Sequence, residues 1–230
     1  MELKIQDVAE LLQVSEKELH RWIKENRIPV HKIGHQYRFN KAEISDWIVT
    51  NNIPVSGKIL NFNISRNPVR LTELIRRGGV HHSIAGGTIS DVIRNAVGIM
   101  TTPAGIEKDA IVAALLQRED LMPTAIGGGI AVPHPRNPLI ADAEDERIAI
   151  SFPAKRLEYK ALDGIPIHTL FIVLSATPKR HLEMLSKISY LCQQEKFVDL
   201  LDSGADSESI IGFIADRERE WQSKDGGVDA

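Results

Sequence analysis

The sequence predicts two domains, a small and mainly α-helical one followed by an α/β domain with a mixed sheet flanked by helices. An asparagine-rich segment, TNNIPVSGKILNFNISRNP, divides the chain. Before this segment, apolar residues recur at helical spacing, and after it helical patterns surround short apolar runs of strand length. We therefore expect a first domain at 1–50, a linker at 51–68, a second domain at 69–217 and a C-terminal tail at 218–230.

The composition narrows the class of protein. The chain has 230 residues, of which 43% are hydrophobic, so it can bury two separate cores. Its net charge of -3 predicts no general attraction to polyanions. Apolar runs such as LFIVL are much shorter than the ~20 residues of a membrane helix, and MELKIQDVAE is not a signal peptide. We expect a cytoplasmic protein with no membrane insertion.

The first domain has the element order of a winged helix-turn-helix. IQDVAELLQV places its apolar residues on one helical face, and Ser15 stands three residues before Glu18, which is the spacing of a capping box. The second helix, EKELHRWIKEN, then exposes a basic face. IPVHKIGHQYRF predicts two strands around a turn at Gly34, which form the wing, and KAEISDWI predicts a closing helix.

Basic residues gather on the second helix and the wing, whereas most acidic residues of this domain lie in its outer helices. This face is therefore positive although the domain is nearly neutral, and each phosphate contact would add salt-dependent affinity for DNA. The alternative is a solvated helical face that contacts another protein. The candidate DNA-binding residues are Ser15, Lys17, His20, Arg21, Lys24, Lys32 and Arg38.

Residues 1–48 resemble the excisionase-type, MerR-like winged helix-turn-helix family. The resemblance rests on IQDVAELLQVSEKELHRWIKENRIPVHKIGHQYRFNKAEISDWI, which has the V-S turn, the I-P after the second helix, the K-x-G wing and the terminal Trp-apolar pair. It implies DNA binding, often on paired sites, and hence a homodimer. His20 and His35 depart from the family, which often has a basic or aromatic residue at the first position and a basic residue at the second, so phosphate contact by the wing should be weaker at neutral pH.

The second domain has helical and strand-like segments in alternation. The segment LTELIRRGGVH predicts a short strand or a turn of helix at its start. The expected helices span 88–97, 106–116, 181–192, 195–202 and 207–220, and the expected strands span 130–132, 147–152 and 168–176.

One histidine is held in an unusual setting, AIGGGIAVPHPRN. The three glycines allow close backbone approach and leave amides uncovered, while Pro133 and Pro135 restrict the chain on both sides of His134. A ring fixed in this way suits a general base, a metal ligand or a nucleophile. The metal role lacks a second ligand at characteristic spacing, and the pair His81–His82 looks like part of an exposed glycine-rich loop.

The nucleophile role requires a cation, a second polar group and uncovered amides. Arg118 ends a helix that leads into the glycine loop, and His181 opens a helix whose amides and positive end could meet an anion. A phosphoryl group fits these parts, because imidazole accepts it as a phosphoramidate. The alternative is a structural histidine in a proline-rich loop. We interpret His168, which lies in a strand, as a half-buried core histidine, and we expect no metal and no cofactor.

The stretch LLQREDLMPTAIGGGIAVPHPRN resembles the active site of the fructose/mannitol type IIA domain of the phosphoenolpyruvate:sugar phosphotransferase system, EIIA type 2. The likeness continues in LDGIPIHTLFIVLSATPKRHLEMLSKISYLCQQEKFVDLL and covers residues 69–217. It implies that His134 is phosphorylated, that His181 supports the phosphoryl group, and that Arg118 is the active-site arginine. It also implies an HPr-type phosphocarrier as donor. Pro135 departs from the family, which usually has Gly or Ala there, and removes a backbone donor.

Together the two resemblances imply a phosphotransferase component that works through a phosphohistidine intermediate and couples it to DNA binding in transcription regulation. A phosphoryl group adds about -1.5 to -2 charges near neutral pH. One alternative is a phosphocarrier of sugar uptake that serves a IIB-type acceptor and whose N-terminal domain binds protein. Another is a regulator that has lost phosphotransfer, which the presence of His134, Arg118 and His181 argues against.

Overall fold

The structure is a computed structural model of the 230-residue chain. It describes residues 2–12, 14–34, 36–40, 43–44, 47–48, 68–159, 161 and 163–225. Most of the expected linker and His35 of the wing therefore lie outside the described residues.

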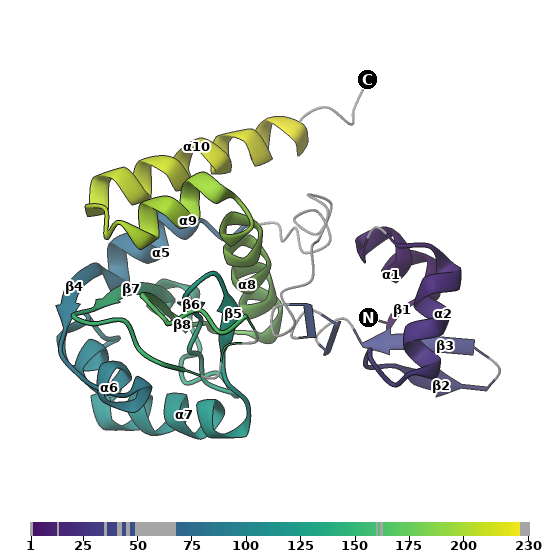
Figure 1. Ribbon diagram of the computed structural model, residues 1–230, viewed down its shortest axis with the longest axis horizontal. Helices are drawn as coiled ribbons and strands as arrows, with labels where there is room; N and C mark the ends of the chain where they lie inside the picture. Colours follow the sequence, from purple (N-terminus) through teal and green to yellow (C-terminus); the bar gives the residue numbers. More distant parts are fainter. Residues whose placement is uncertain are drawn as a thin grey trace.

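The N-terminal domain contains the predicted helix-turn-helix and the hairpin (Figure 1). Its elements are β1 (Glu2–Leu3), α1 (Ile5–Leu12), α2 (Glu16–Lys24), β2 (His31–Ile33) and β3 (Gln36–Asn40). The strands form an antiparallel sheet in the order β1-β3-β2. The prediction of a helical unit with a two-stranded wing is confirmed.

Ser15 caps α2 as its spacing predicts, because its side chain accepts a hydrogen bond from the Glu18 amide at 3.2 Å. Only this half of the capping box is among the described contacts, and the Glu18 carboxylate instead binds Arg21 at 2.6 Å. Trp47 lies at a helical position and donates to the Arg27 carbonyl at 2.7 Å. Half of the expected closing helix at 41–48 lies outside the described residues.

The C-terminal domain is built on a five-stranded mixed sheet in the order β4-β7-β8-β6-β5. Its strands are β4 (Val80–Ile84), β5 (Ala125–Gly127), β6 (Ile130–Ala131), β7 (Arg147–Pro153) and β8 (Thr169–Leu174). Its helices are α5 (Leu71–Gly78), α6 (Ile89–Ile99), α7 (Lys108–Leu121), α8 (Pro178–Cys192), α9 (Glu195–Asp202) and α10 (Ser207–Asp225), with a short 3₁₀ helix at Ala143–Asp145. Within the described ranges, no helix has the length and apolar character of a membrane span.

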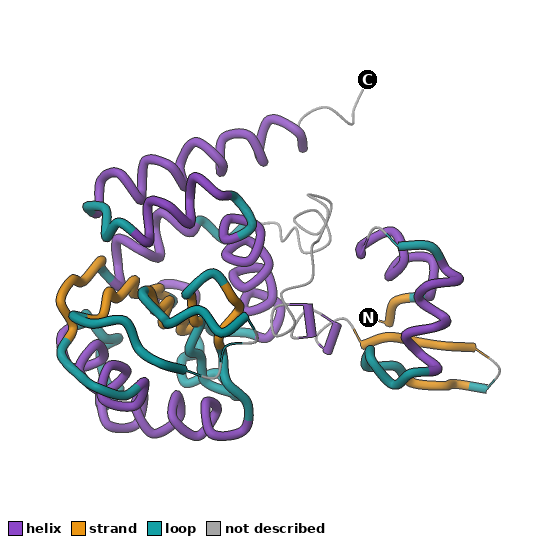
Figure 2. Tube along the Cα trace, viewed as in Figure 1, coloured by secondary structure: helices purple, strands orange, loops and turns teal. Residues whose placement is uncertain are grey.

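Helices cover both faces of this sheet, as the sequence predicts (Figures 1 and 2). Alternate residues of β7 point to opposite faces. Ile148 and Ile150 pack with Phe171 of β8 against α5, α8, α9 and α10. Ala149 packs with Ile172 of β8 against α6 and α7 on the other face. The two central strands are buried on both faces, which explains why their sequences are mostly apolar.

Several segments differ from the sequence-based expectation. The start of the domain, expected as a short strand or a turn of helix, is the eight-residue helix α5, and α8 begins three residues before the expected position 181. Strands β4 and β5 were not expected, and His81 and His82 lie within β4 rather than in a loop. Helix α7 continues five residues beyond its expected end at 116, and α10 continues to Asp225, into the expected tail. Buried Glu218 explains this extension, because its carboxylate accepts hydrogen bonds from the Leu71 amide at 2.5 Å and from the Thr72 hydroxyl at 2.7 Å.

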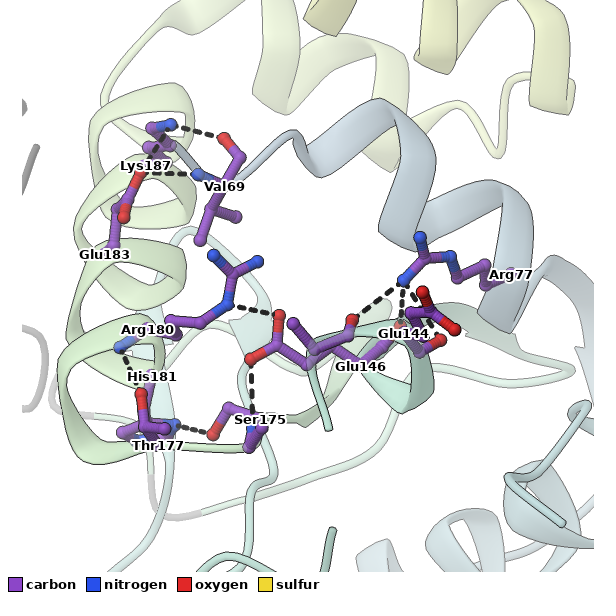
Figure 3. Close-up of polar contacts among 12 residues, drawn as sticks. Val69, Arg77, Glu144, Glu146, Ser175, Thr177, Arg180, His181, Glu183 and Lys187 are labelled. Atoms are coloured by element: carbon purple, nitrogen blue, oxygen red, sulfur yellow. Dashed lines mark hydrogen bonds and ion pairs between the residues drawn. The ribbon is translucent and has the colours of Figure 1, made fainter. Parts of the chain in front are cut away.

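The beginning of the second domain is fixed on α8 (Figure 3). The Val69 amide donates to Glu183 at 2.7 Å, and the Val69 carbonyl accepts from Lys187 at 2.5 Å. Glu183 and Lys187 are themselves an ion pair at 3.0 Å, one helical turn apart. The chain that enters α5 is therefore held by the same helix that carries His181 in its first turn.

Candidate functional site

His134, His181 and Arg118 come together at one pocket, although they are distant in the sequence. The rings of His134 and His181 have their centroids 4.7 Å apart. The pocket has a volume of about 170 Å³ and is also lined by Ser175 and Arg136. None of its lining residues is Asp or Glu. Two arginines and two imidazoles with no carboxylate among them make a site suited to an anion.

The backbone around His134 fixes which nitrogen of its ring is free. The Nδ1 atom lies 2.8 Å from the Val132 carbonyl oxygen. A carbonyl can only accept, so Nδ1 carries the proton, and the lone pair of the neutral ring is on Nε2. The Val173 amide donates to the Pro133 carbonyl at 3.0 Å and ties this loop to β8. His134 is 6% exposed and has one defined orientation.

Both rings are held neutral. Burial, followed by the nearby His181 and Arg118, lowers the pKa of His134 from its ordinary value of 6.5 to about 3. Burial and Arg118 lower the pKa of His181 to about 4. A neutral imidazole can act as a nucleophile, whereas imidazolium cannot, so this environment keeps His134 reactive at physiological pH.

Arg118 reaches the pocket because the end of α7 is clamped to the start of β5. Its guanidinium donates to the Met122 carbonyl at 2.8 Å. The adjacent Glu119 is buried and accepts hydrogen bonds from the Thr124 amide at 2.8 Å, from the Thr124 hydroxyl at 2.6 Å and from the Tyr159 hydroxyl. One carboxylate therefore fixes the direction in which the chain leaves the helix, and with it the position of Arg118.

The first turn of α8 brings the ring of His181 to the pocket, and most of its backbone amides are already used or absent. The His181 amide donates to the Thr177 carbonyl at 2.9 Å, and Pro178 at the first helical position has no N–H. The Arg180 amide donates a hydrogen bond to the Thr177 hydroxyl at 3.3 Å. The expectation that amides at this helix start face the anion is therefore wrong for these positions, because the helix already uses or lacks them.

The glycine turn before His134 is also not part of the pocket. The Gly128 amide donates to the Asp163 carboxylate at 2.7 Å, so it is not uncovered. Gly129 has φ +71, and a Cβ atom there would lie 2.3 Å from the ring of His168. The turn therefore needs glycine for close packing against His168, which is buried at the start of β8. Gly128 and Gly129 therefore have structural roles in the turn that leads to His134, through the contact with Asp163 and the packing against His168.

Two polar residues that line the pocket were not predicted from the sequence. Arg136 follows Pro135 and adds a second guanidinium to the pocket. Ser175 places its hydroxyl 3.1 Å from Nδ1 of His181 (Figure 3). The arginine could have been inferred from its position two residues after His134. Nothing in the sequence marks Ser175, because its contact depends on how β8 turns into α8.

The candidate DNA-binding residues are distributed over one helix and the wing. Lys17, His20 and Lys24 are exposed on α2, and Lys32 is exposed on β2. Ser15 is the N-cap. Arg21 is exposed but lies 2.6 Å from Glu18, and Arg38 binds the Gln36 side chain and the Tyr37 carbonyl.

The helix and the wing meet at a groove on this domain. The groove has a volume of about 350 Å³ and is lined by His20, Tyr37, Arg38 and Lys4, among others. His20 contacts Tyr37 edge to face, with ring centroids 5.8 Å apart. Two of the predicted residues, His20 and Arg38, are thus brought together from separate elements, with no acidic residue in the lining.

The fold and the site define a two-domain protein in which a helix-turn-helix precedes an α/β domain with a paired-histidine anion pocket. Comparison with known families gives the same division. The chain belongs to the family described as "Phosphoenolpyruvate-dependent sugar phosphotransferase system, EIIA 2", whose model matches residues 73–217. A helix-turn-helix domain model matches residues 2–51.

The chain is similar both to a component of a sugar phosphotransferase system and to nitrogen regulatory proteins. It is 28% identical over 149 residues to the PTS system fructose-specific EIIABC component of Bacillus subtilis. The aligned region covers 64% of this chain but only 23% of that protein. It is 26% identical over 151 residues to the Nitrogen regulatory protein of Pseudomonas aeruginosa. Here the aligned region covers 64% of this chain and 96% of that protein. Nitrogen Regulatory Protein IIA-Ntr from Neisseria meningitidis has the same fold, with a TM-score of 0.54 and 21% identity over 62% of this chain and 97% of that one.

Proposed function

We propose that the chain accepts a phosphoryl group on Nε2 of His134 from an HPr-type histidine phosphocarrier, and that this modification regulates DNA binding by the N-terminal domain. The observation that carries the proposal is the pairing of two neutral imidazoles with Arg118 in a pocket lined by no carboxylate. Membership of the EIIA type-2 family supports a phosphotransferase role.

The proposed transfer is an exchange between two imidazoles. The Nε2 lone pair of His134 attacks phosphorus, and a new N–P bond forms as the donor N–P bond breaks. The electron pair of the broken bond returns to the donor nitrogen. The donor ring leaves as neutral imidazole because its other nitrogen carries a proton in the phosphorylated state. The proton of His134 stays on Nδ1, which donates it to the Val132 carbonyl, so the phosphorylated ring takes on the positive charge that the donor ring carried before the transfer.

Charge in the pocket favours the phosphorylated state. The transferring group carries oxygens with negative charge, and Arg118 and Arg136 are the two guanidiniums that line the site. His181 would donate a hydrogen bond to one phosphoryl oxygen. Because Pro135 has no N–H, these side chains would supply contacts that the backbone cannot make at that position.

The regulatory part of the proposal rests on the helix-turn-helix domain. The two named relatives differ, since one is a fructose-specific component and the other a nitrogen regulatory protein. A helix-turn-helix matched at residues 2–51 favours regulation, because its exposed basic residues on α2 and the wing suit the DNA backbone. A sugar-uptake carrier that serves a IIB-type acceptor is the alternative, and a homodimer on paired DNA sites stays a prediction.

Phosphoryl uptake tests the proposal directly. The full chain is incubated with phosphoenolpyruvate, enzyme I and HPr, and the mass increase of one phosphoryl group is measured before and after acid treatment. We expect one acid-labile phosphoryl group on the wild type and none on His134→Gln. The matched control is His82→Gln, which changes an exposed histidine of β4 and should label normally. Full labelling of His134→Gln would contradict the proposal.

A further inference from the structure

Ser175 makes a contact with the pocket that phosphoryl transfer would use. It lies between β8 and α8, is 8% exposed, and places its hydroxyl 3.1 Å from Nδ1 of His181 (Figure 3). We propose that Ser175 is a positioning residue that holds His181 in the tautomer with its proton on Nε2, facing the phosphoryl group on His134. The inference rests on the proposed phosphoryl transfer.

The direction of this hydrogen bond follows from the chemistry of the ligand. A neutral imidazole has one nitrogen that donates and one that accepts. Phosphoryl oxygens only accept, so His181 can bind one of them only through an N–H. Its Nδ1 faces Ser175, so the proton must be on Nε2, and the Ser175 hydroxyl must donate to Nδ1. Without this hydroxyl the ring would be free to take the other tautomer and lose its contact with the anion.

A buried carboxylate holds Ser175 in place. Glu146 immediately precedes β7 and is 0% exposed. It accepts a hydrogen bond from the Ala176 amide at 3.0 Å and from Nε of Arg180 at 2.6 Å (Figure 3). Ala176 follows Ser175, and Arg180 precedes His181. Glu146 therefore fixes the residues next to Ser175 and next to His181. The Arg180 guanidinium balances the negative charge of the buried Glu146 carboxylate.

The same strand connects Ser175 to His134. The Val173 amide, two residues before Ser175, donates to the Pro133 carbonyl, one residue before His134, at 3.0 Å. The loop that carries the nucleophile and the loop that carries Ser175 therefore leave the sheet side by side. Ser175 thus orients the ring of His181, while the ring of His134 is already fixed by the Val132 carbonyl.

Nitrogen-15 NMR of the histidine side chains in the full chain tests the tautomer. In the wild type we expect His181 to carry its proton on Nε2. In Ser175→Ala we expect a mixture of the two tautomers, and in Ser175→Thr, which keeps the hydroxyl, the wild-type tautomer. His181 protonated on Nδ1 in the wild type would overturn the inference without reference to any variant.

Phosphoryl uptake from HPr provides the second measurement. We expect Ser175→Ala to slow uptake about tenfold, which is the scale of one lost hydrogen bond, and Ser175→Thr to restore the rate at least partly. A Ser175→Ala protein with wild-type rate and tautomer would overturn the role of the serine while labelling of His134 stands. Failure of the wild type to take up label would instead contradict the proposed function itself.

Discussion

The Val132 carbonyl oxygen lies 2.8 Å from Nδ1 of His134 and thereby leaves the lone pair of the neutral ring on Nε2. The carbonyl belongs to the chain two residues before the histidine, so the tautomer is set locally. Pro133 and Pro135 restrict the backbone on both sides of His134, and this restriction fixes the geometry of the hydrogen bond to Val132. The nitrogen that the proposed transfer requires is therefore left free by the fold of the loop itself.

Loss of Arg118 should impair phosphoryl uptake. Arg118→Gln removes the guanidinium that lies close enough to both histidines to lower their pKa values. We expect uptake from HPr to slow by about 10²–10³-fold, the scale seen when one preorganised donor to a developing negative charge is removed. Rapid-quench labelling measures the rate.

Arg136→Gln is the matched comparison for this prediction, since it changes the same residue type at the same pocket. Arg136 is exposed, so its effect should be smaller than that of Arg118. Equal and negligible effects of both substitutions would contradict an anion site in this pocket.

His134 and His181 should make the free energy of unfolding decrease as the pH is lowered. Their folded pKa values, about 3 for His134 and about 4 for His181, lie below the ordinary 6.5. The unfolded chain therefore binds more protons than the folded chain below pH 6.5, and stability falls as the pH decreases from 6.5 towards 4. Each histidine contributes up to about 1.4 kcal/mol per pH unit.

Thermal unfolding of the full chain between pH 4.5 and 7.5 measures this loss. His134→Gln should unfold with a shallower dependence on pH than the wild type, because one of the two groups no longer titrates. His82→Gln, which changes an exposed histidine, should retain the wild-type dependence. Identical slopes for the wild type and His134→Gln would argue against a buried neutral ring.

Glu119 should be a major determinant of stability in the second domain. Glu119→Ala leaves the Thr124 amide and two hydroxyls without their buried acceptor, and we expect a loss of roughly 3 kcal/mol. Tyr159→Phe removes a single hydroxyl from the same carboxylate and should cost less. Denaturant unfolding provides both values. A loss for Tyr159→Phe as large as that for Glu119→Ala would contradict the central role of the carboxylate.

DNA binding by the full chain should weaken with salt. Lys17 and Lys24 are exposed on α2, and if each contacts a phosphate, Lys17→Gln or Lys24→Gln should reduce the slope of log K against log salt by about one. Fluorescence anisotropy with duplex DNA over a range of salt concentrations measures the slope. Lys196→Gln, which changes an exposed residue of α9, is the control and should leave the slope unchanged. A flat salt response of the wild type would favour the protein-binding alternative.

Local sequence patterns predict the helices and strands well where one rule dominates. The 195–202 helix and the 147–152 strand agree with α9 and β7 to within one residue. Strands β4 and β5 were missed because they are short and contain polar or small residues, and their pairing with β7 and β6 is a tertiary effect. The end of α10 depends on Glu218 reaching the start of α5, which no local pattern contains.

The candidate site divides in the same way. His134, His181 and Arg118 were found from motif and resemblance, and the structure places them at one pocket. The expectation of uncovered amides was wrong for Gly128 and His181, because the Gly128 amide binds Asp163 and the His181 amide is used within α8. Ser175 and Glu146 were missed, since their contacts join residues from separate elements.

The attachment of the phosphoryl group tests the account most directly. After labelling with phosphoenolpyruvate, enzyme I and HPr, phosphorus-31 and nitrogen-15 NMR of the intact chain identify the residue and the nitrogen that carry the group. Our account predicts phosphorus bonded to Nε2 of His134, with the proton of that ring retained on Nδ1 beside Val132. Phosphorus on Nδ1, or on any other residue, would contradict it.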